Sequence, residues 1–136
     1  REDEDFTRHD DVDREAVCIA VSERSAYDLW LTANFNRARI VRAPSIKAAH
    51  QMFFENEVNV LASLKPKLLE DMESHKGLRL IKTPFTAVKQ SVGIAKGKPE
   101  AATFLNALIV DLARNGWIAA QLRRHGVAKK LGVPAI

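Results

Sequence analysis

The stretch Val17–Leu31, V-C-I-A-V-S-E-R-S-A-Y-D-L-W-L, decides the predicted fold. An apolar run, Val17–Val21, ends at four polar residues, and an amphipathic pattern over Ala26–Asn34 follows at once. This order predicts a buried strand, a short loop and a helix. In an open parallel sheet the loop after such a strand lies at the carboxyl edge, where ligands bind.

Ser25 stands where the predicted helix begins, and Asp28 follows three residues later, which is the spacing of a capping box. A helix start offers free backbone N–H groups and the positive end of the helix dipole, and both suit an anion. Serine is also a common helix cap. Two interpretations therefore stay open: Ser25 only caps the helix, or it also binds a ligand.

Strand and helix patterns alternate at intervals of about twenty residues along the first part of the chain. The expected strands are Val17–Val21, Ala38–Arg42, Val58–Leu64 and Leu78–Lys82, and the expected helices are Ala26–Asn34, Ile46–Glu55 and Lys67–His75. The inner faces predicted for these helices are Ala26, Leu29, Trp30 and Ala33, then Ile46, Ala49, Met52 and Phe53, then Leu68, Leu69 and Met72. Such alternation predicts an α/β fold with a mostly parallel sheet and flanking helices.

The alternation of strand and helix patterns ends after the fourth predicted strand. The sequence predicts that the chain has five parts. An acidic, loose lead-in (1–14) precedes an α/β ligand-binding lobe (15–86), and a hinge-type strand (87–97) follows it. C-terminal helices (98–126) are expected at Glu100–Arg114 and Trp117–His125, before an irregular tail (127–136).

The charge is unevenly distributed. The chain has 136 residues and a formal net charge of +4, but residues 1–15 hold eight acids, so the remainder carries eighteen Lys and Arg against nine acids. These cations are scattered singly and no aromatic residues interleave with them, so nucleic-acid binding is not expected. No apolar run reaches the length of a membrane helix, so direct membrane insertion is not expected either.

We find no pattern in the sequence that predicts catalysis, a metal or a cofactor. Cys18 is the single cysteine and lies in an apolar run, the four histidines are isolated, and no glycine-rich phosphate loop follows the first strand. The strand-end loops offer polar groups instead. The candidate ligand-binding residues are Ser22, Arg24, Ser25 and Lys65, a set that suits a small anion.

The segment S-V-G-I-A-K-G-K-P-E (Ser91–Glu100) and the later N-G-W-I-A-A-Q-L-R-R-H-G (Asn115–Gly126) carry a resemblance to a known family. From about Val12 to Val127 the chain resembles the second lobe and C-terminal helices of type II periplasmic solute-binding proteins, the amino-acid-binding family of ABC importers. Ser25 falls on the family's Ser/Thr that holds a ligand carboxylate. Arg24 replaces a glycine, and Leu64 stands where the family often has an Asp for the ligand's amino group.

The resemblance implies a periplasmic protein without catalysis, made with a signal peptide and a first lobe encoded before residue 1. It would bind a solute between two lobes and deliver it to the membrane permease of an ABC importer. Because Leu64 supplies no carboxylate, the expected solute is an anion such as an organic acid. The alternative is a ligand-sensing domain of a transcription regulator or sensor kinase with the same architecture.

The expected C-terminal helices carry an apolar stripe that, in the family, packs on the first lobe. Without that lobe, a second copy of the chain could cover the stripe. We therefore expect a homodimer through Phe104, Leu108, Leu112 and Trp117.

Overall fold

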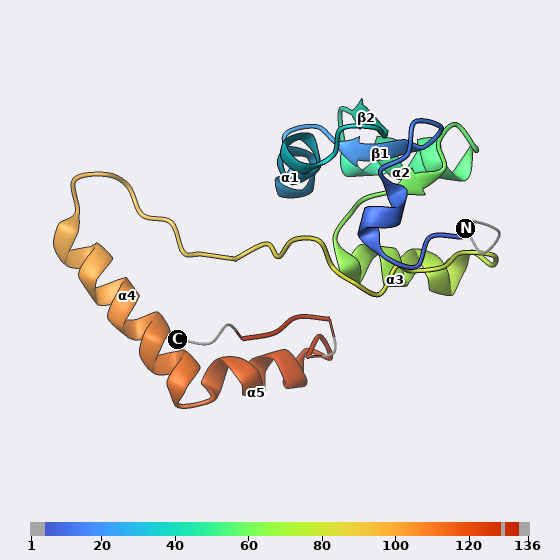
Figure 1. Ribbon diagram of the computed structural model, residues 1–136. Coiled ribbons are helices and arrows are strands. Elements are labelled where there is room, and N and C mark those ends of the chain that lie inside the picture. The colour runs from blue at the N-terminus through green and yellow to red at the C-terminus, as the bar shows by residue number, and fades with distance from the viewer. Residues whose placement is uncertain (1–4, 129, 134–136) are drawn as a thin grey trace. The chain divides into compact units, whose positions relative to one another are not determined.

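The computed structural model describes residues 5–128 and 130–133, and it divides the chain into two compact units, 1–88 and 89–136. The first unit is an α/β fold whose three parallel strands are flanked by helices (Figure 1). Its elements are η1 (His9–Val12), β1 (Cys18–Ser22), α1 (Ala26–Asn34), β2 (Arg39–Ala43), α2 (Ile46–Phe54), β3 (Val60–Leu61) and α3 (Lys65–Ser74). The predicted fold class is confirmed.

β1 is the central strand of the sheet, which has the order β2-β1-β3. Along β2 the register runs from Cys18 opposite Arg39 to Ser22 opposite Ala43, and on the other side Ile19 lies opposite Val60. A central strand must bury both faces, and this requirement explains the unbroken apolar run in the sequence.

The two faces of β1 pack against different helices because successive side chains of a strand point to opposite sides. Ile19 and Val21 join one core cluster with Tyr27 and Leu31 of α1. Ala20 joins the second cluster with Ala49 and Phe53 of α2, together with Ala43 and Val58. The sheet therefore lies between α1 and α2.

Of the inner face predicted for α1, Trp30 packs against the first core cluster, but Ala26, Leu29 and Ala33 are exposed, so most of the prediction is wrong. Tyr27, Asp28 and Leu31 are its buried residues, whereas Leu29 is 63% exposed. On α2 the buried residues are Ala49, His50 and Phe53, and Ile46 is exposed. On α3 Asp71 is buried and Met72 is exposed. The face predicted for α2 is therefore largely confirmed, because Ala49 and Phe53 are buried and Met52 packs against the second cluster. In α1 and α3, by contrast, a buried aspartate lies on the inner face.

The acidic segment is not a loose lead-in over residues 5–14. Phe6 and Val12 are buried in the first core cluster. The carboxylate of Asp13 accepts N–H bonds from Asn36, Arg37 and Ala38 at 3.1, 2.8 and 2.8 Å. This segment therefore ties the loop between α1 and β2 to the start of the unit.

The fourth predicted strand, Leu78–Lys82, and the hinge-type strand over 87–97 are absent, since the described residues 75–98 contain no helix or strand. Leu78 packs against the second core cluster and Ile81 against the first, while the Arg79 guanidinium donates to the Phe6 carbonyl. The segment buries its apolar residues by packing rather than by pairing with the sheet.

The second unit contains α4 (Pro99–Arg114) and α5 (Trp117–Arg124), joined at Gly116, whose φ of +80° suits glycine. Both predicted C-terminal helices are confirmed. None of the described residues in this unit is buried, and Phe104 and Trp117 are 66% and 51% exposed. None of the described helices is long and apolar enough to cross a membrane.

Candidate functional site

The carboxyl edge of the sheet brings three strand-to-helix loops together. Because the strands are parallel, β1, β2 and β3 all end at this edge, and α1, α2 and α3 begin there. The backbone N–H of Glu23 donates to the Ala43 carbonyl at 2.9 Å and joins the first two loops. The loops that contain Ser22–Ser25 and Ser63–Lys65 therefore emerge at one edge.

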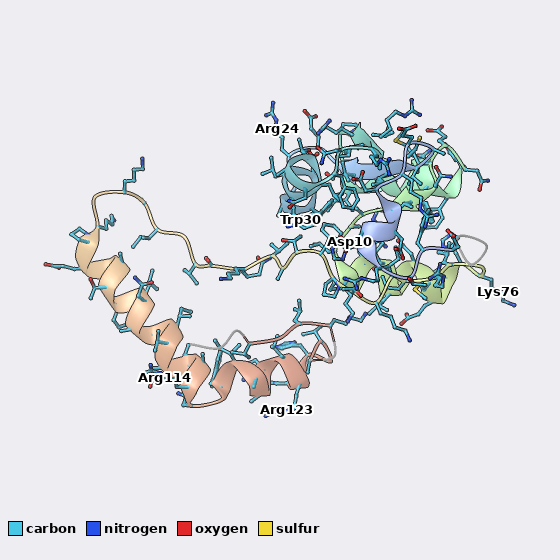
Figure 2. All side chains as sticks on the ribbon, in the orientation of Figure 1. Asp10, Arg24, Trp30, Lys76, Arg114 and Arg123 are labelled. Atoms are coloured by element: carbon cyan, nitrogen blue, oxygen red, sulfur yellow. The ribbon has the colours of Figure 1, made fainter. Side chains whose placement is uncertain are left out.

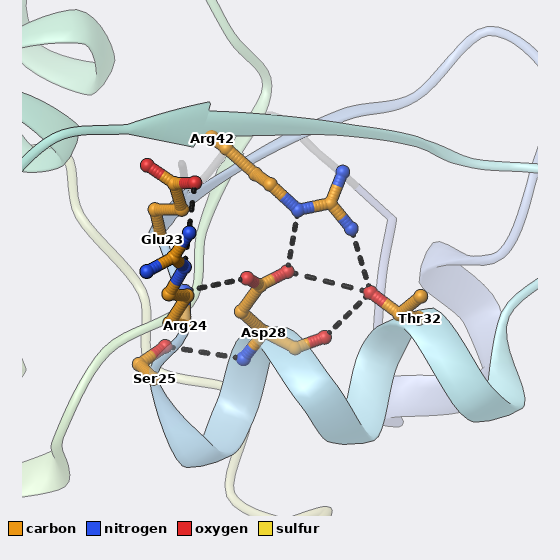
Figure 3. A network of polar contacts seen from close by, with 6 residues as sticks. All are labelled: Glu23, Arg24, Ser25, Asp28, Thr32 and Arg42. Atoms are coloured by element: carbon orange, nitrogen blue, oxygen red, sulfur yellow. Dashed lines mark hydrogen bonds and ion pairs between the residues drawn. The ribbon is translucent and has the colours of Figure 1, made fainter.

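Ser25 is the N-cap of α1, as the sequence predicts. Its Oγ accepts the backbone N–H of Asp28 at 3.1 Å (Figure 3). The Asp28 carboxylate then accepts the backbone N–H of Arg24, not of Ser25, at 2.8 Å. The spacing of a capping box is thus present, but its second bond is shifted by one residue.

Asp28 also connects α1 to β2. Its Oδ1 accepts a hydrogen bond from Nε of Arg42 at 3.0 Å, and Nη2 of Arg42 donates to the Thr32 hydroxyl at 2.7 Å (Figure 3). The Asp28 side chain is 4% exposed and that of Arg42 is 42% exposed. The Asp28 carboxylate therefore already occupies the start of α1, where a ligand anion was expected. The sequence did not predict Arg42 as the ion-pair partner of Asp28.

Arg24 has a left-handed backbone with φ of +59°. Residues other than glycine are strained in this backbone conformation because their Cβ atom crowds the following carbonyl oxygen. The guanidinium is 89% exposed, lies 3.8 Å from Glu23 and projects from the surface (Figure 2). This geometry leaves its charge available to a ligand at the carboxyl edge.

The other two predicted ligand residues also lie at this edge. Ser22 is the last residue of β1 and is half-buried. Lys65 is the first residue of α3 and is exposed. The N-cap of α3 is Leu64, which makes no side-chain cap hydrogen bond. Ligand binding by Ser22, Arg24, Ser25 and Lys65 stays a prediction.

Three residues that the sequence did not connect meet beside the third loop. Nε2 of His50, on α2, lies 3.0 Å from Oγ of Ser63, and its Nδ1 lies 2.6 Å from Oδ2 of Asp71 on α3. A charged residue such as Asp71 is usually solvated, but here it is only 7% exposed. The signal in the sequence was weak, because the three residues are separated along the chain and lie on different elements.

The part of the chain that the structure describes contains no cluster of three or more His, Cys, Asp or Glu side chains able to hold a metal ion. Comparisons of the chain with protein-family models, with curated proteins and with solved structures find no match. The fold and the edge loops define the class of the first unit as an α/β domain with a parallel sheet and a polar carboxyl edge.

Proposed function

We propose that residues 15–86 form one lobe of an exported solute-binding protein that delivers a small anion to the permease of an ABC importer. The observation that carries this proposal is the central position of β1, which ends in the loop with Ser22, Arg24 and Ser25. The loop that ends in Lys65 emerges at the same edge of the sheet. Parallel α/β sheets bind ligands at this edge.

The charge of the edge supports an anionic solute. Arg24 and Lys65 are exposed, and among the described residues the one ion pair that either side chain makes is that of Arg24 with Glu23 at 3.8 Å. The start of α1 is different, because Asp28 already contacts the Arg24 N–H. We therefore assign the main attraction for the anion to the two cationic side chains, with the hydroxyls of Ser22 and Ser25 adding hydrogen bonds.

In this proposal the binding and delivery of the solute involve no catalytic step. A second lobe closes over the solute, and closure is driven by contacts that exist only in the closed state. The protein acts in the periplasm, and the partner of the closed form is the permease. A sensory domain of a transcription regulator or sensor kinase would use the same edge to report a metabolite, and the segments that flank this chain in its gene discriminate between the two.

The test is a thermal-shift screen of the full-length protein against organic acids and amino acids, followed by isothermal titration of the hits. The expected result is binding of an acid that weakens about tenfold in Lys65→Gln and in Arg24→Gly. Lys76→Gln is the matched control, because Lys76 follows the end of α3 and lies away from its start. Tight binding of neutral or cationic amino acids, but of no acid, would contradict the proposal.

A further inference from the structure

The cluster of Ser63, His50 and Asp71 has the order of a hydroxyl, an imidazole and a carboxylate. The hydroxyl oxygen of Ser63 is 3.0 Å from Nε2, and Oδ2 of Asp71 is 2.6 Å from Nδ1. Nδ1 of His50 and Oδ2 of Asp71 lie at ion-pair distance but outside hydrogen-bond geometry, so the contact is electrostatic, and the negative carboxylate favours the tautomer with the proton on Nδ1. With that proton on Nδ1 of a neutral imidazole, Nε2 accepts the Ser63 proton.

Burial holds this arrangement in place. His50 and Asp71 are 5% and 7% exposed, respectively. Nζ of Lys67 lies 3.3 Å from Oδ1 of Asp71, so the second carboxylate oxygen faces a positive charge. The Phe54 ring lies 6.5 Å from the imidazole, centroid to centroid. The imidazole therefore has Ser63 at Nε2 and the Asp71 carboxylate at Nδ1, and the second contact holds the ring by electrostatic attraction.

The surroundings of Ser63 suit attack on a carbonyl group. Ser63 lies between β3 and α3 and is only half-buried. The next residue, Leu64, is the N-cap of α3 and makes no side-chain cap hydrogen bond. Pro66 has no N–H and the Lys67 N–H donates to the Leu64 carbonyl at 2.9 Å, so of the first three helix residues it is Lys65 whose N–H is left for a developing oxyanion. Lys65 adds a positive charge two residues beyond the hydroxyl.

We propose that Ser63 is an activated nucleophile that accepts the acyl group of small carboxylic esters, with His50 as general base and Asp71 as the positioning residue. This activity goes beyond the proposed solute binding and does not depend on it. A purely structural buried network would hold α2 and α3 together but would leave the Ser63 hydroxyl no more reactive than that of an ordinary exposed serine.

The reaction has two balanced halves. Oγ of Ser63 forms a bond to the carbonyl carbon while its proton passes to Nε2 of His50. The bond between that carbon and the alcohol oxygen then breaks, and His50 returns the proton to the leaving alkoxide. The products are acyl-Ser63 and the free alcohol, and a water molecule repeats the sequence to release the acid and restore the serine.

The experiment exposes the whole chain to a fluorophosphonate probe and locates the adduct by peptide mass spectrometry. In this reaction an oxygen–phosphorus bond to serine forms and fluoride leaves. We expect Ser63 to be labelled at least about 100-fold faster than Ser74, an exposed serine on α3, and faster than Ser63 in the urea-unfolded chain. Ser74→Ala leaves the rate unchanged, while Ser63→Ala abolishes the adduct.

Two further variants separate activation from packing. His50→Gln slows the labelling by about 100-fold, and Asp71→Asn changes the pH profile of the labelling rate, which a loss of packing alone would not move. If these variants do not fold, the comparison between native and unfolded wild-type chain still decides the question. A Ser63 adduct that forms no faster in the native chain than in urea, or no adduct at all, overturns the proposal.

Discussion

Oδ1 of Asp28 lies 3.0 Å from Nε of Arg42, and this contact joins the first turn of α1 to β2. The same carboxylate accepts the backbone N–H of Arg24 at 2.8 Å. One buried side chain therefore fixes the β1–α1 loop, the helix start and the neighbouring strand. The shape of the candidate edge depends on it, although Asp28 itself was predicted only as part of a capping pattern.

Replacing Asp28 by asparagine should therefore destabilise the first unit. Asp28→Asn removes the charge partner of Arg42 and weakens the acceptor for the Arg24 N–H. Because Arg42 is 42% exposed, water screens part of the pair, and we expect a loss of about 2–3 kcal/mol in the free energy of unfolding. Urea denaturation measures the loss. Glu23→Gln, at the exposed and more distant Arg24 pair, is the control and should change stability by less than about 0.5 kcal/mol.

The left-handed backbone of Arg24 predicts a stabilising substitution. Arg24→Gly removes the Cβ strain at φ of +59°, and the greater chain entropy of glycine in the unfolded state offsets part of the gain. The expected gain is about 0.5–1 kcal/mol in the free energy of unfolding. Arg24→Ala removes the same charge but keeps Cβ, so it should bring no gain. Equal stabilisation by both variants would show that charge, and not backbone strain, is responsible.

Local patterns were enough to predict the fold class. The apolar run before Ser22 required a doubly buried strand, and the spacing after Ser25 required a helix, so β1 and α1 lie within one residue of their predicted bounds. The strand predicted at Leu78–Lys82 failed because apolar alternation cannot tell pairing in a sheet from packing of an irregular segment. Leu78 and Ile81 satisfy the same pattern by contacting the two core clusters.

The candidate site was predictable only where its residues are neighbours in sequence. Ser25 and Asp28 belong to one helix turn, so their cap bond could be expected from spacing. The contacts of Asp28 with Arg42 and of His50 with Ser63 and Asp71 depend on how separate elements pack. A single sequence gives no measure of that packing, and a charged residue such as Asp71 is most often exposed.

The N-terminal acids predict a specific acid sensitivity. Hydrogen bonds from the Arg8 backbone, the Thr7 side chain and the Thr7 backbone lower the pKa of Asp11 to about 2. Burial raises the pKa of Asp13, but the N–H groups of Ala38, Asn36 and Arg37 outweigh it, and its pKa is lowered overall. As pH falls, these two carboxylates therefore bind protons in the unfolded chain before they do so in the folded chain. The free energy of unfolding that they contribute above pH about 4 is lost as pH falls toward about 2.

Asp13→Asn tests this link between the acidic segment and the sheet. The variant should lose about 1–2 kcal/mol at neutral pH, because the loop N–H groups lose a charged acceptor, and its stability should depend less on pH between about 4 and 2. Urea unfolding followed at a series of pH values measures both effects. Asp10→Asn, at an exposed carboxylate in the same segment, is the matched control. An unchanged pH dependence in Asp13→Asn would contradict the assignment.

The apolar stripe of the second unit predicts self-association of this chain. Phe104 and Trp117 are exposed, Leu108 and Leu112 are only half-buried, and no described residue of the unit reaches the burial of a core. Sedimentation at increasing concentration should give a rising mass, and Leu108→Glu should shift the chain toward monomer because a charge would enter the apolar contact. Asn106→Glu adds the same charge at an exposed position of α4 outside the predicted stripe and should leave the mass unchanged. A wild-type chain that stays monomeric at the highest concentration would show that the apolar stripe does not bind a second copy of the chain.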